Sequence, residues 1–360
     1  MGYILVINPG STSTKVAIFK NDENVIQNNL THSSEEIAKY EKMADQLEMR
    51  QHLIEQWVLE QGYKLEDLDA VVGRGGLLRP MPGGTYEVTQ GMIKDLEVGF
   101  QGEHASNLGG LIAKAIADKS NVKSYIVDPV AVDEFEEVAR ISGMPEIKRR
   151  SLGHALNIKA VGRRVAKDLG KNLEEVNLVV AHIGGGISIC PLEKGKAIDY
   201  NNANEMGPFS PERTGGLPCG DLVKMCFSGK YTLAEIKKKI SGKGGLVAYL
   251  GTNDVREVQT MVDEGDERAL LIFKAMAYQI AKEIGQMATV LKGNVDAVVM
   301  TGGVSYSKTL TAWVEEMVSF IAPYHVVPGE DEMLALAEGA IRVLNGEEKA
   351  KIYEEEVNIG

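Results

Sequence analysis

Two segments far apart in the chain share one pattern, and this pattern limits the fold more than any other feature. Residues 4–19 (ILVINPGSTSTKVAIF) and residues 178–192 (LVVAHIGGGISICPL) each predict a strand, a tight turn of small residues and a second strand. They open the two halves of the chain. The pattern favours an internal duplication with a binding site in the cleft between the halves. Two unrelated hairpins are the alternative.

The rest of the chain alternates between predicted strands and predicted helices. Short apolar runs predict strands at residues 70–72, 124–127, 297–300 and 325–327. Helices are predicted at residues 34–61, after residue 104, at 155–169 and 268–291, from residue 308, and at 332–344. For the first of these, Ser33 and Glu36 predict a capping box and Gly62 predicts the end. Strands that alternate with long helices predict an α/β fold with largely buried sheets.

Length and charge restrict the classes of protein. A chain of 360 residues predicts two domains, each able to bury its own core. The net charge of -12 argues against binding to a nucleic-acid backbone, which needs a basic surface. Small anions can still be bound by a few local arginines and backbone amides.

Cysteine spacing and apolar runs predict a soluble, cytoplasmic protein without a membrane partner. Cys190, Cys219 and Cys226 match neither a zinc site nor a redox pair, so we expect reduced thiols. The first residues, MGYILVINPG, lack the basic region of a signal peptide. No apolar run approaches the ~18 residues that a membrane span needs.

The first turn carries the groups of an anion-binding site. Its small residues let backbone N–H groups converge, Ser11 and Ser13 add hydroxyls, and Lys15 adds a positive charge. The turn lacks the glycine spacing of a Walker loop. It predicts a phosphate cradle, and a plain Ser/Thr-rich hairpin turn remains the alternative.

Two glycine turns follow predicted strands. Gly184-Gly185-Gly186 comes after the strand at 178–181, and Gly302-Gly303 after the strand at 297–300. Such glycines are useful where a backbone must approach a ligand closely. Two of these turns at strand ends of an α/β protein favour a nucleotide that lies across the ends of the sheets.

Charged residues near turns and strand ends are candidates for the remaining chemistry. Arg74 and Arg213 lie among glycines, where a guanidinium can bind a carboxylate or phosphate in bidentate geometry, although solvated surface arginines are common. Asp128, at a strand end, and the acidic run 330–332 offer oxygens for a hard cation, while a dipole-stabilised helix start also explains the run. Residues 252–254 with Glu257 predict a helix N-cap. His104 and His154 are either catalytic or cap helix starts.

Together these motifs resemble the acetate/butyrate kinase (acetokinase) family, within the actin-like, sugar-kinase and heat-shock ATPase superfamily. The resemblance covers nearly the whole chain, and Asn8 stands where most other branches of the superfamily carry aspartate. The segments at 5–15 and 181–188 match the two signatures of the family, and the other segments are closer to butyrate and branched-chain fatty-acid kinases than to acetate kinases. The segments that carry the resemblance are LVINPGSTSTK (5–15), GRGG (73–76), HASNLGG (104–110), AHIGGGIS (181–188), GPFSPERTGGLPCGD (207–221), GTNDVRE (251–257), MTGGVSYS (300–307) and EDEMLALAEGA (330–340).

The resemblance implies a fold, a domain division and an activity. The fold would be α/β, with duplicated actin-like (ribonuclease H-like) domains and an interdomain ATP cleft. The first domain would comprise residues 1–150 with a C-terminal helix at about 330–360, and the second residues 151–329. The activity would be reversible, Mg²⁺- and ATP-dependent phosphorylation of butyrate to butyryl phosphate by direct in-line transfer. The enzyme would be a homo-oligomer of at least two chains.

The resemblance also implies roles for residues at the matching motif positions. Magnesium binding is implied for Asp128 and Glu332. Nucleotide or phosphate binding is implied for Asn8, Ser11, Ser13, Lys15, His182, Gly184, Gly185, Gly186, Asp254, Arg256, Gly302 and Gly303. Substrate binding is implied for Arg74, His104 and Gly153, and catalysis for Arg74, His154, Asp128 and Arg213.

Two departures from acetate kinases bear on catalysis and on the acid. Pro218 stands where those enzymes bring a second arginine, which leaves Arg213 as the nearest substitute. Gly153 replaces a phenylalanine before His154, and we expect the smaller residue to leave room for additional methylenes, each contributing up to ~0.8 kcal/mol when buried. Isobutyrate, another branched acid, acetate or propionate are alternative substrates. An actin-like ATPase switch is a remote alternative, against which Asn8 and the arginine-bearing glycine loops speak.

Overall fold

The computed structural model describes residues 2–357, which form two compact units. The first consists of the described residues of 1–133 and 331–360, and the second of residues 134–330. The boundaries expected from the sequence lie after residues 150 and 329, so the segment 134–150 lies in the other unit from the one expected. Its side chains explain this. Phe135 packs edge-on against Tyr200 with ring centroids 5.0 Å apart, and Glu134 pairs with Lys159 at 2.8 Å.

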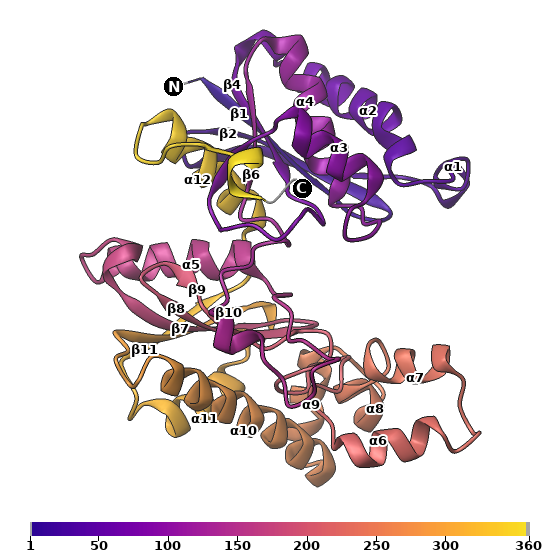
Figure 1. Ribbon diagram of the computed structural model, residues 1–360, viewed down its shortest axis with the longest axis vertical. Helices are drawn as coiled ribbons and strands as arrows, with labels where there is room; N and C mark the ends of the chain where they lie inside the picture. The colour runs from indigo at the N-terminus through magenta and orange to yellow at the C-terminus, as the bar shows by residue number, and fades with distance from the viewer. Residues whose placement is uncertain (1, 358–360) are drawn as a thin grey trace. The chain divides into compact units, whose positions relative to one another are not determined.

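The first unit is built on a seven-stranded mixed sheet (Figure 1). Strand β1 pairs antiparallel with β2 and parallel with β4, and β4 pairs parallel with β6. In spatial order the strands are β12 (Lys351–Ile352), β5 (Thr85–Glu87), β6 (Lys123–Val127), β4 (Leu68–Arg74), β1 (Tyr3–Pro9), β2 (Ser13–Lys20) and β3 (Glu23–Thr31).

Helices cover both faces of this sheet. The main core joins Leu5 and Ile7 of β1 to Ile54 of α2 and Ile112 of α4. Figure 1 shows α12 on the side of the strands opposite to α2 and α4. The helices and helical turns are α1 (Ser34–Ile37), η1 (Ala44–Gln46), α2 (Leu47–Glu60), η2 (Leu65–Asp67), α3 (Gln90–Val98), α4 (Asn107–Ser120), α12 (Glu332–Leu344) and α13 (Tyr353–Glu356).

The second unit has a five-stranded sheet. Strand β7 pairs antiparallel with β8 and parallel with β10, and β10 pairs parallel with β11. In spatial order the strands are β11 (Tyr324–Pro328), β10 (Ala297–Gly302), β7 (Asn177–Ile183), β8 (Ile187–Glu193) and β9 (Lys196–Ala197).

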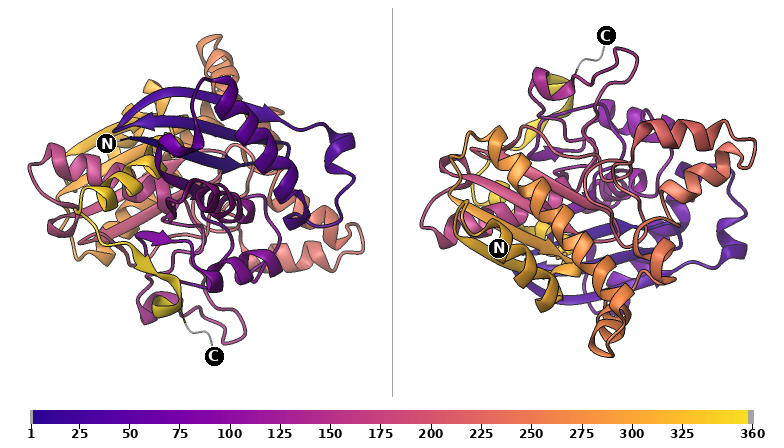
Figure 2. Two further views of the ribbon diagram at one scale, coloured as in Figure 1. Left: turned by 90° about the horizontal axis from the view of Figure 1, so that it is seen from above. Right: turned by 90° about the horizontal axis from the view of Figure 1, so that it is seen from below.

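Strand β7 alternates its side chains between two layers of helices, as a strand buried on both faces must. Val180 packs with Ile158 of α5, whereas Val179 packs with Ile280 of α10 and Val314 of α11. Figure 2 (right) shows α10 lying along the sheet of this unit. The helices and helical turns are η3 (Glu137–Arg140), α5 (Ala155–Asp168), η4 (Leu173–Glu175), α6 (Cys219–Cys226), α7 (Leu233–Ile240), α8 (Gly245–Leu250), α9 (Val255–Asp263), α10 (Glu267–Val290), η5 (Gly303–Tyr306) and α11 (Lys308–Val318).

The two sheets share one topology. The order β6-β4-β1-β2-β3 in the first unit corresponds to β11-β10-β7-β8-β9 in the second, with the same parallel and antiparallel pairings. The hairpins of residues 4–19 and 178–192 are therefore equivalent, and the predicted duplication is confirmed. Helix α5 follows β6 but belongs to the second unit, while α12 follows β11 but belongs to the first.

The predicted helix at 34–61 is wrong in its middle. Ser33 caps α1 as expected, because its Oγ accepts a hydrogen bond from Glu36 N at 3.2 Å. The helix then stops, and Asp45 accepts from the backbone N of Lys42 at 3.1 Å. Such a local side-chain bond offers the backbone an alternative to helix, and α2 begins only at Leu47.

Between residues 2 and 357 no helix combines the length and the apolar character that crossing a membrane requires. Cys190 is buried, Cys219 and Cys226 are exposed, and all three are free thiols.

Candidate active site

The first unit gathers polar side chains at the carboxyl ends of three adjacent parallel strands. Asn8 lies at the end of β1, Arg74 at the end of β4, and Asp128 directly after β6. The strand register places these ends at one edge of the sheet, since Ile7 pairs with Gly73 and Arg74 pairs with Val127. Ligands of α/β proteins bind at this edge.

Glu332 joins two of these side chains from the first turn of α12. Its Oε2 accepts a hydrogen bond of 2.7 Å from Asn8 Nδ2, and its Oε1 pairs with Nη1 of Arg74. Asp331, the N-cap, accepts from the backbone N of Leu334 and so fixes the start of this helix. The acidic run thus serves two purposes, because Asp331 caps the helix and Glu332 reaches the sheet edge.

Asp128 is held in an unusual position. It is 1% exposed, has a φ of +37°, and accepts a hydrogen bond of 2.7 Å from Gly84 N at Oδ1. A positive φ is strained for a residue with a side chain, although aspartate and asparagine tolerate it better than others. Such strain at a strand end is often associated with function.

The phosphate-cradle turn lies beside Asn8. Lys15 of β2 is the direct cross-strand partner of Asn8, so the two side chains share a face of the sheet, and Ser13 lies two residues before Lys15 on that face. Ser11 and Lys15 are exposed. The buried Arg50 of α2, which sequence reasoning missed, donates to the carbonyl oxygen of Gly10 beneath the turn at 2.8 Å.

His104 precedes α4 and lies close enough to Arg74 for its positive charge to affect the imidazole. Its Nδ1 accepts a hydrogen bond of 3.2 Å from the backbone N of Ser106, which places the ring proton of the neutral form on Nε2. Desolvation, and then the positive charge of Arg74, lower the pKa of His104 below its usual value. The imidazole therefore favours its neutral form as a hydrogen-bond donor.

The second unit repeats the arrangement at the carboxyl ends of β7, β10 and β11. Gly184 follows β7, Gly302 ends β10, and Glu330 follows β11. A Cβ atom at Gly302, whose φ is +90°, would lie 2.4 Å from the carbonyl oxygen of Ile183. This glycine is thus required by the close approach of β10 to β7.

A cavity of about 1020 Å³ opens beside these strand ends. It brings together Gly184, Gly185, Asp254, Arg256 and Gly303, which lie in three separate motifs of the sequence. Other lining residues were assigned no site role from the sequence, among them Asn253, Tyr306, Ser307 and Lys308. A volume of this size suits a nucleotide-sized ligand.

Asp254 and Arg256 form one rim of this cavity. Asp254 is the N-cap of α9, accepts from the backbone N of Arg256 at 2.8 Å, and pairs with its guanidinium at 2.5 Å. These bonds lower the pKa of Asp254 to about 2. The predicted cap at residues 252–254 is confirmed, and Glu257 bonds to the hydroxyl of Thr252.

His154 and His182 form a stacked pair. Their rings are 3.9 Å apart at an angle of 12°, and Nδ1 of His154 lies 2.9 Å from the hydroxyl of Ser188. Asn157 Nδ2 donates to Nδ1 of His182 at 2.8 Å, which leaves the proton of the neutral ring on Nε2. Nε2 lies 3.1 Å from Glu330 Oε1, without the alignment of a hydrogen bond.

Arg213 lies against the triple-glycine turn. A Cβ atom at Gly186 would come within 2.3 Å of Nη1 of Arg213, so only glycine lets the guanidinium approach this closely. Nη1 donates to the carbonyl oxygen of Ala203 at 3.0 Å, and Nε is buried without a hydrogen-bond partner among the described residues. The triple-glycine turn and Arg213, which are separate candidates in the sequence, are therefore neighbours in the structure.

Gly153 has a different surrounding from the one expected. A Cβ atom there would lie 2.7 Å from the ring of Tyr200 and 3.1 Å from the hydroxyl of Ser188. The direction of the missing side chain is thus already filled by Tyr200. The ring of Tyr200 therefore occupies the space beside Gly153 in which additional methylenes were expected.

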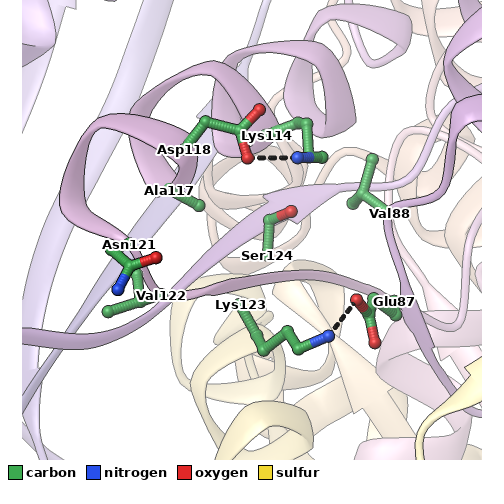
Figure 3. A pocket seen from close by; sticks show the side chains of 9 residues that line it. All are labelled: Glu87, Val88, Lys114, Ala117, Asp118, Asn121, Val122, Lys123 and Ser124. Carbon is green, nitrogen blue, oxygen red and sulfur yellow. Dashed lines mark hydrogen bonds and ion pairs between the residues drawn. The ribbon is translucent and has the colours of Figure 1, made fainter.

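A smaller pocket of about 290 Å³ lies in the first unit, away from the strand ends that carry the candidate residues (Figure 3). The charges around it are paired, Lys114 with Asp118 and Lys123 with Glu87 at 2.5 Å. Because these ion pairs satisfy each other, we assign no role to this pocket.

Asp128 and Glu332 suit a magnesium ion by the chemistry of their donors. Both are carboxylates at one edge of the first unit's sheet, and a carboxylate has lone pairs beyond the hydrogen bonds described. The described residues contain no group of three or more His, Cys, Asp or Glu side chains that could hold a metal alone. Mg²⁺ needs none, since it commonly binds one or two carboxylates together with substrate phosphates and water.

Comparison with known proteins places the chain in a family. The sequence model described as the acetokinase family matches residues 146–321. "Probable butyrate kinase 2" of Caldanaerobacter subterraneus subsp. tengcongensis is 55% identical over 350 residues, which is 97% of this chain and 99% of the relative. "Butyrate kinase 2" of Clostridium acetobutylicum is 54% identical over 351 residues, with the same shares of both chains. The chain belongs to the acetokinase family.

A solved structure shows the same fold. The crystal structure of Porphyromonas gingivalis acetate kinase matches with a TM-score of 0.81 at 21% identity, covering 96% of this chain and 100% of that one. With the repeated sheet topology, this likeness confirms the predicted fold class, duplicated actin-like (ribonuclease H-like) domains of α/β type.

Proposed function

We propose that this protein transfers the γ-phosphoryl group of ATP to the carboxylate of butyrate, forming butyryl phosphate and ADP in a reversible reaction. The observation that carries the proposal is the 54–55% identity, over 97% of the chain, to proteins named as butyrate kinases. The polar strand ends and the nucleotide-sized cavity support it independently.

The chemistry requires charge screening more than proton transfer. A short carboxylic acid has a pKa near ~4 and is ionised at neutral pH, so no general base is needed. The barrier arises because an anion must approach an anionic phosphate in line. Positioned cations and hydrogen-bond donors lower such a barrier.

In the first unit, Arg74 is proposed to hold the carboxylate or the transferred phosphoryl group. Its pairing with Glu332 supports this role by fixing the guanidinium at the end of β4. His104, near Arg74 and favoured in its neutral form, is proposed to donate a hydrogen bond to the substrate. Asn8 and the hydroxyls and lysine of residues 11–15 are proposed to line the phosphates.

Magnesium is proposed to bind through Asp128 and Glu332. When bound, the ion would neutralise charge on the phosphate oxygens. This chain holds both carboxylates in place. Asp128 accepts a hydrogen bond from Gly84 N, and Glu332 accepts bonds from Asn8 and Arg74.

In the second unit, the large cavity is proposed to bind the nucleotide. Asp254, Arg256, Gly302 and Gly303 are assigned to the adenosine end, and Gly184 to Gly186 with His182 to the phosphates. His154 is proposed to bond to oxygens of the transferred group, supported by its stacking on His182. Arg213 is proposed as the second catalytic cation, supported by its approach to Gly186.

Formation of butyryl hydroxamate from butyrate, MgATP and hydroxylamine tests the proposed reaction. We expect butyrate to give a higher kcat/KM than acetate or propionate, by up to ~4-fold per additional buried methylene. An isobutyrate optimum would replace butyrate by a branched acid. Absence of product with every short acid would contradict the proposed function and favour an ATP-driven conformational switch.

Location and assembly are proposed from the same resemblance. We infer a cytoplasmic enzyme, in agreement with its free thiols, and a homo-oligomer of at least two chains. Light scattering coupled to size-exclusion chromatography would contradict the second inference if the mass were that of the 39.1 kDa chain.

A further inference from the structure

Arg50 of α2 is a fully buried arginine that is bonded to the backbone of the turn between β1 and β2. Its exposed fraction is 0%. Nη1 donates to the carbonyl oxygens of Gly10 at 2.8 Å and Ser13 at 3.2 Å, and Nη2 donates to that of Ser11 at 3.2 Å. One guanidinium therefore holds three carbonyl groups of a single short turn.

The remaining partners of Arg50 are also neutral. Nη1 donates to the hydroxyl of Thr14 at 3.1 Å, and Gln46 Oε1 accepts from Nε at 3.1 Å and from Nη2 at 2.8 Å. No described carboxylate forms an ion pair with Arg50, which is unusual because buried charges are normally paired. Its burial lowers its pKa to about 10, so it is still charged at neutral pH. The turn therefore lies over an uncompensated positive charge.

The direction of the carbonyl groups decides where the amides of the turn point. In a trans peptide, the C=O of one residue and the N–H of the next point in opposite directions. Because the carbonyls of Gly10 and Ser11 point at Arg50, the N–H groups of Ser11 and Thr12 point away from it. Neither N–H donates to another residue between 2 and 357. Two free amide donors thus lie on the outer side of the turn, opposite the guanidinium.

We propose that Arg50 is a positioning residue for phosphate binding. By holding three carbonyls inward, it directs the amides of Ser11 and Thr12 outward to a phosphate of the nucleotide, and its unpaired charge attracts the same anion. The inference rests on the proposed assignment of this turn to the phosphate region. Arg50 itself does not touch the ligand.

Two variants and a matched control test the proposal. Arg50→Ala removes the charge and the hydrogen bonds, whereas Arg50→Lys keeps the charge but loses the planar fork that reaches three carbonyls. Ile54→Ala is the control, since Ile54 lies one turn further along α2, is 0% exposed and packs into the core instead of the turn. All three are expected to lower the melting temperature.

The decisive measurement is the Kd of the full chain for MgATP and for AMP, by calorimetry. For Arg50→Ala we expect MgATP binding to weaken at least 10-fold and AMP binding to stay unchanged, because AMP lacks the β- and γ-phosphates, which are the phosphates that we propose the turn binds. Arg50→Lys is expected to weaken MgATP binding at least 3-fold. Millimolar guanidinium is expected to restore part of the MgATP affinity of Arg50→Ala, and Ile54→Ala to bind both nucleotides as the wild type does.

Wild-type MgATP affinity in folded Arg50→Ala, or an equal loss in Ile54→Ala, would overturn the proposal. If Arg50→Ala does not fold, Arg50→Lys decides alone, and wild-type affinity there overturns it. The Kd for MgATP is measured without a carboxylic acid, so it does not depend on which acid is the substrate. A wild-type chain that forms no acyl phosphate, but whose MgATP binding still requires Arg50, would overturn the proposed function and support the inference.

Discussion

Asp128 combines two properties that a single substitution can separate. Its carboxylate accepts a bond from Gly84 N, and its backbone has a φ of +37°. Asparagine tolerates a positive φ and can still accept that bond, whereas alanine adopts a positive φ at a greater cost and cannot accept the bond.

We therefore predict different results for Asp128→Asn and Asp128→Ala. Both should lose most acyl kinase activity, on the order of 100-fold or more in kcat, because the charge of a proposed magnesium ligand is gone. Asp128→Ala should in addition lose about 1–3 kcal/mol more of unfolding free energy than Asp128→Asn. Denaturant unfolding and the hydroxamate assay measure the two effects. Full activity in Asp128→Asn would remove Asp128 from the metal site.

His32 is a second residue whose environment leads to a prediction. Its Nε2 lies 2.9 Å from the hydroxyl of Thr14, and it is 6% exposed. Burial, and then the charge of Arg50, lower its pKa from the usual 6.5, with an opposing contribution from Glu36. Arg50 and His32 thus support the same turn, one charged and one neutral.

The stability of the protein should consequently fall in mild acid. Since the folded-state pKa of His32 lies below 6.5, the unfolded chain takes up the proton first as the pH drops. The free energy of unfolding should decrease as the pH falls from about 6.5 towards the lower folded-state pKa, and this contribution should be constant above 6.5. His32→Gln should reduce the slope, measured by urea unfolding at several pH values. The exposed His52→Gln is the control, and an equal change there would contradict the assignment to His32.

At the scale of elements, close approach of α4 to β4 positions Arg74. A Cβ atom at Gly109 of α4 would lie 2.2 Å from the carbonyl oxygen of Arg74, and one at Gly73 of β4 would lie 2.0 Å from the carbonyl oxygen of Gly109. The helix and the strand thus touch backbone to backbone at the residue proposed to hold the substrate. A side chain at this contact would have to move one element.

Gly109→Ala should therefore harm both stability and activity. We expect a loss of about 1–3 kcal/mol in unfolding free energy, as for other overpacked sites, and a lower kcat/KM because Arg74 is displaced. Gly110→Ala is a matched control on the same helix, since its Cβ would meet Cδ1 of Leu96 at 2.8 Å, the end of a flexible side chain. Thermal unfolding and the hydroxamate assay would contradict the argument if both variants behaved alike.

At the scale of the whole molecule, ligand binding should stabilise the folded chain. At a MgATP concentration of 100 times its Kd, mass action adds ~2.7 kcal/mol. For a chain of 360 residues this corresponds to a rise of roughly 2–4 °C in Tm. Removing Mg²⁺ with EDTA at the same ATP concentration should reduce the rise, which differential scanning fluorimetry measures. An equal rise with EDTA would contradict the proposed role of Asp128 and Glu332 in metal binding.

Much of the fold could be predicted because strands, turns and helices depend largely on the residues next to each other in the sequence. Apolar runs and small-residue turns marked β1, β2, β7 and β10 before any contact was known, and their repetition indicated the duplication that the sheet topology confirms. The prediction of one helix at 34–61 is wrong in its middle, because the short-range hydrogen bond from the backbone N of Lys42 to the carboxylate of Asp45 outweighs the apolar period. Candidate site residues could be identified from their residue type and position in a motif, but the residues to which they bond could not.

The strand-turn-strand hairpins and the glycine turns follow from the amino-acid sequence alone, and the class of chemistry follows from its resemblance to a family. Which side chains meet depends on the tertiary structure. Glu332 bonds to Asn8 across 324 positions of sequence, and Arg50 reaches the turn at 10–14 from the first turn of α2. The same holds for Tyr200, which fills the space at Gly153. Hairpins and turns follow from the preferences of neighbouring residues, whereas contacts between distant residues depend on how elements pack, which no local pattern encodes.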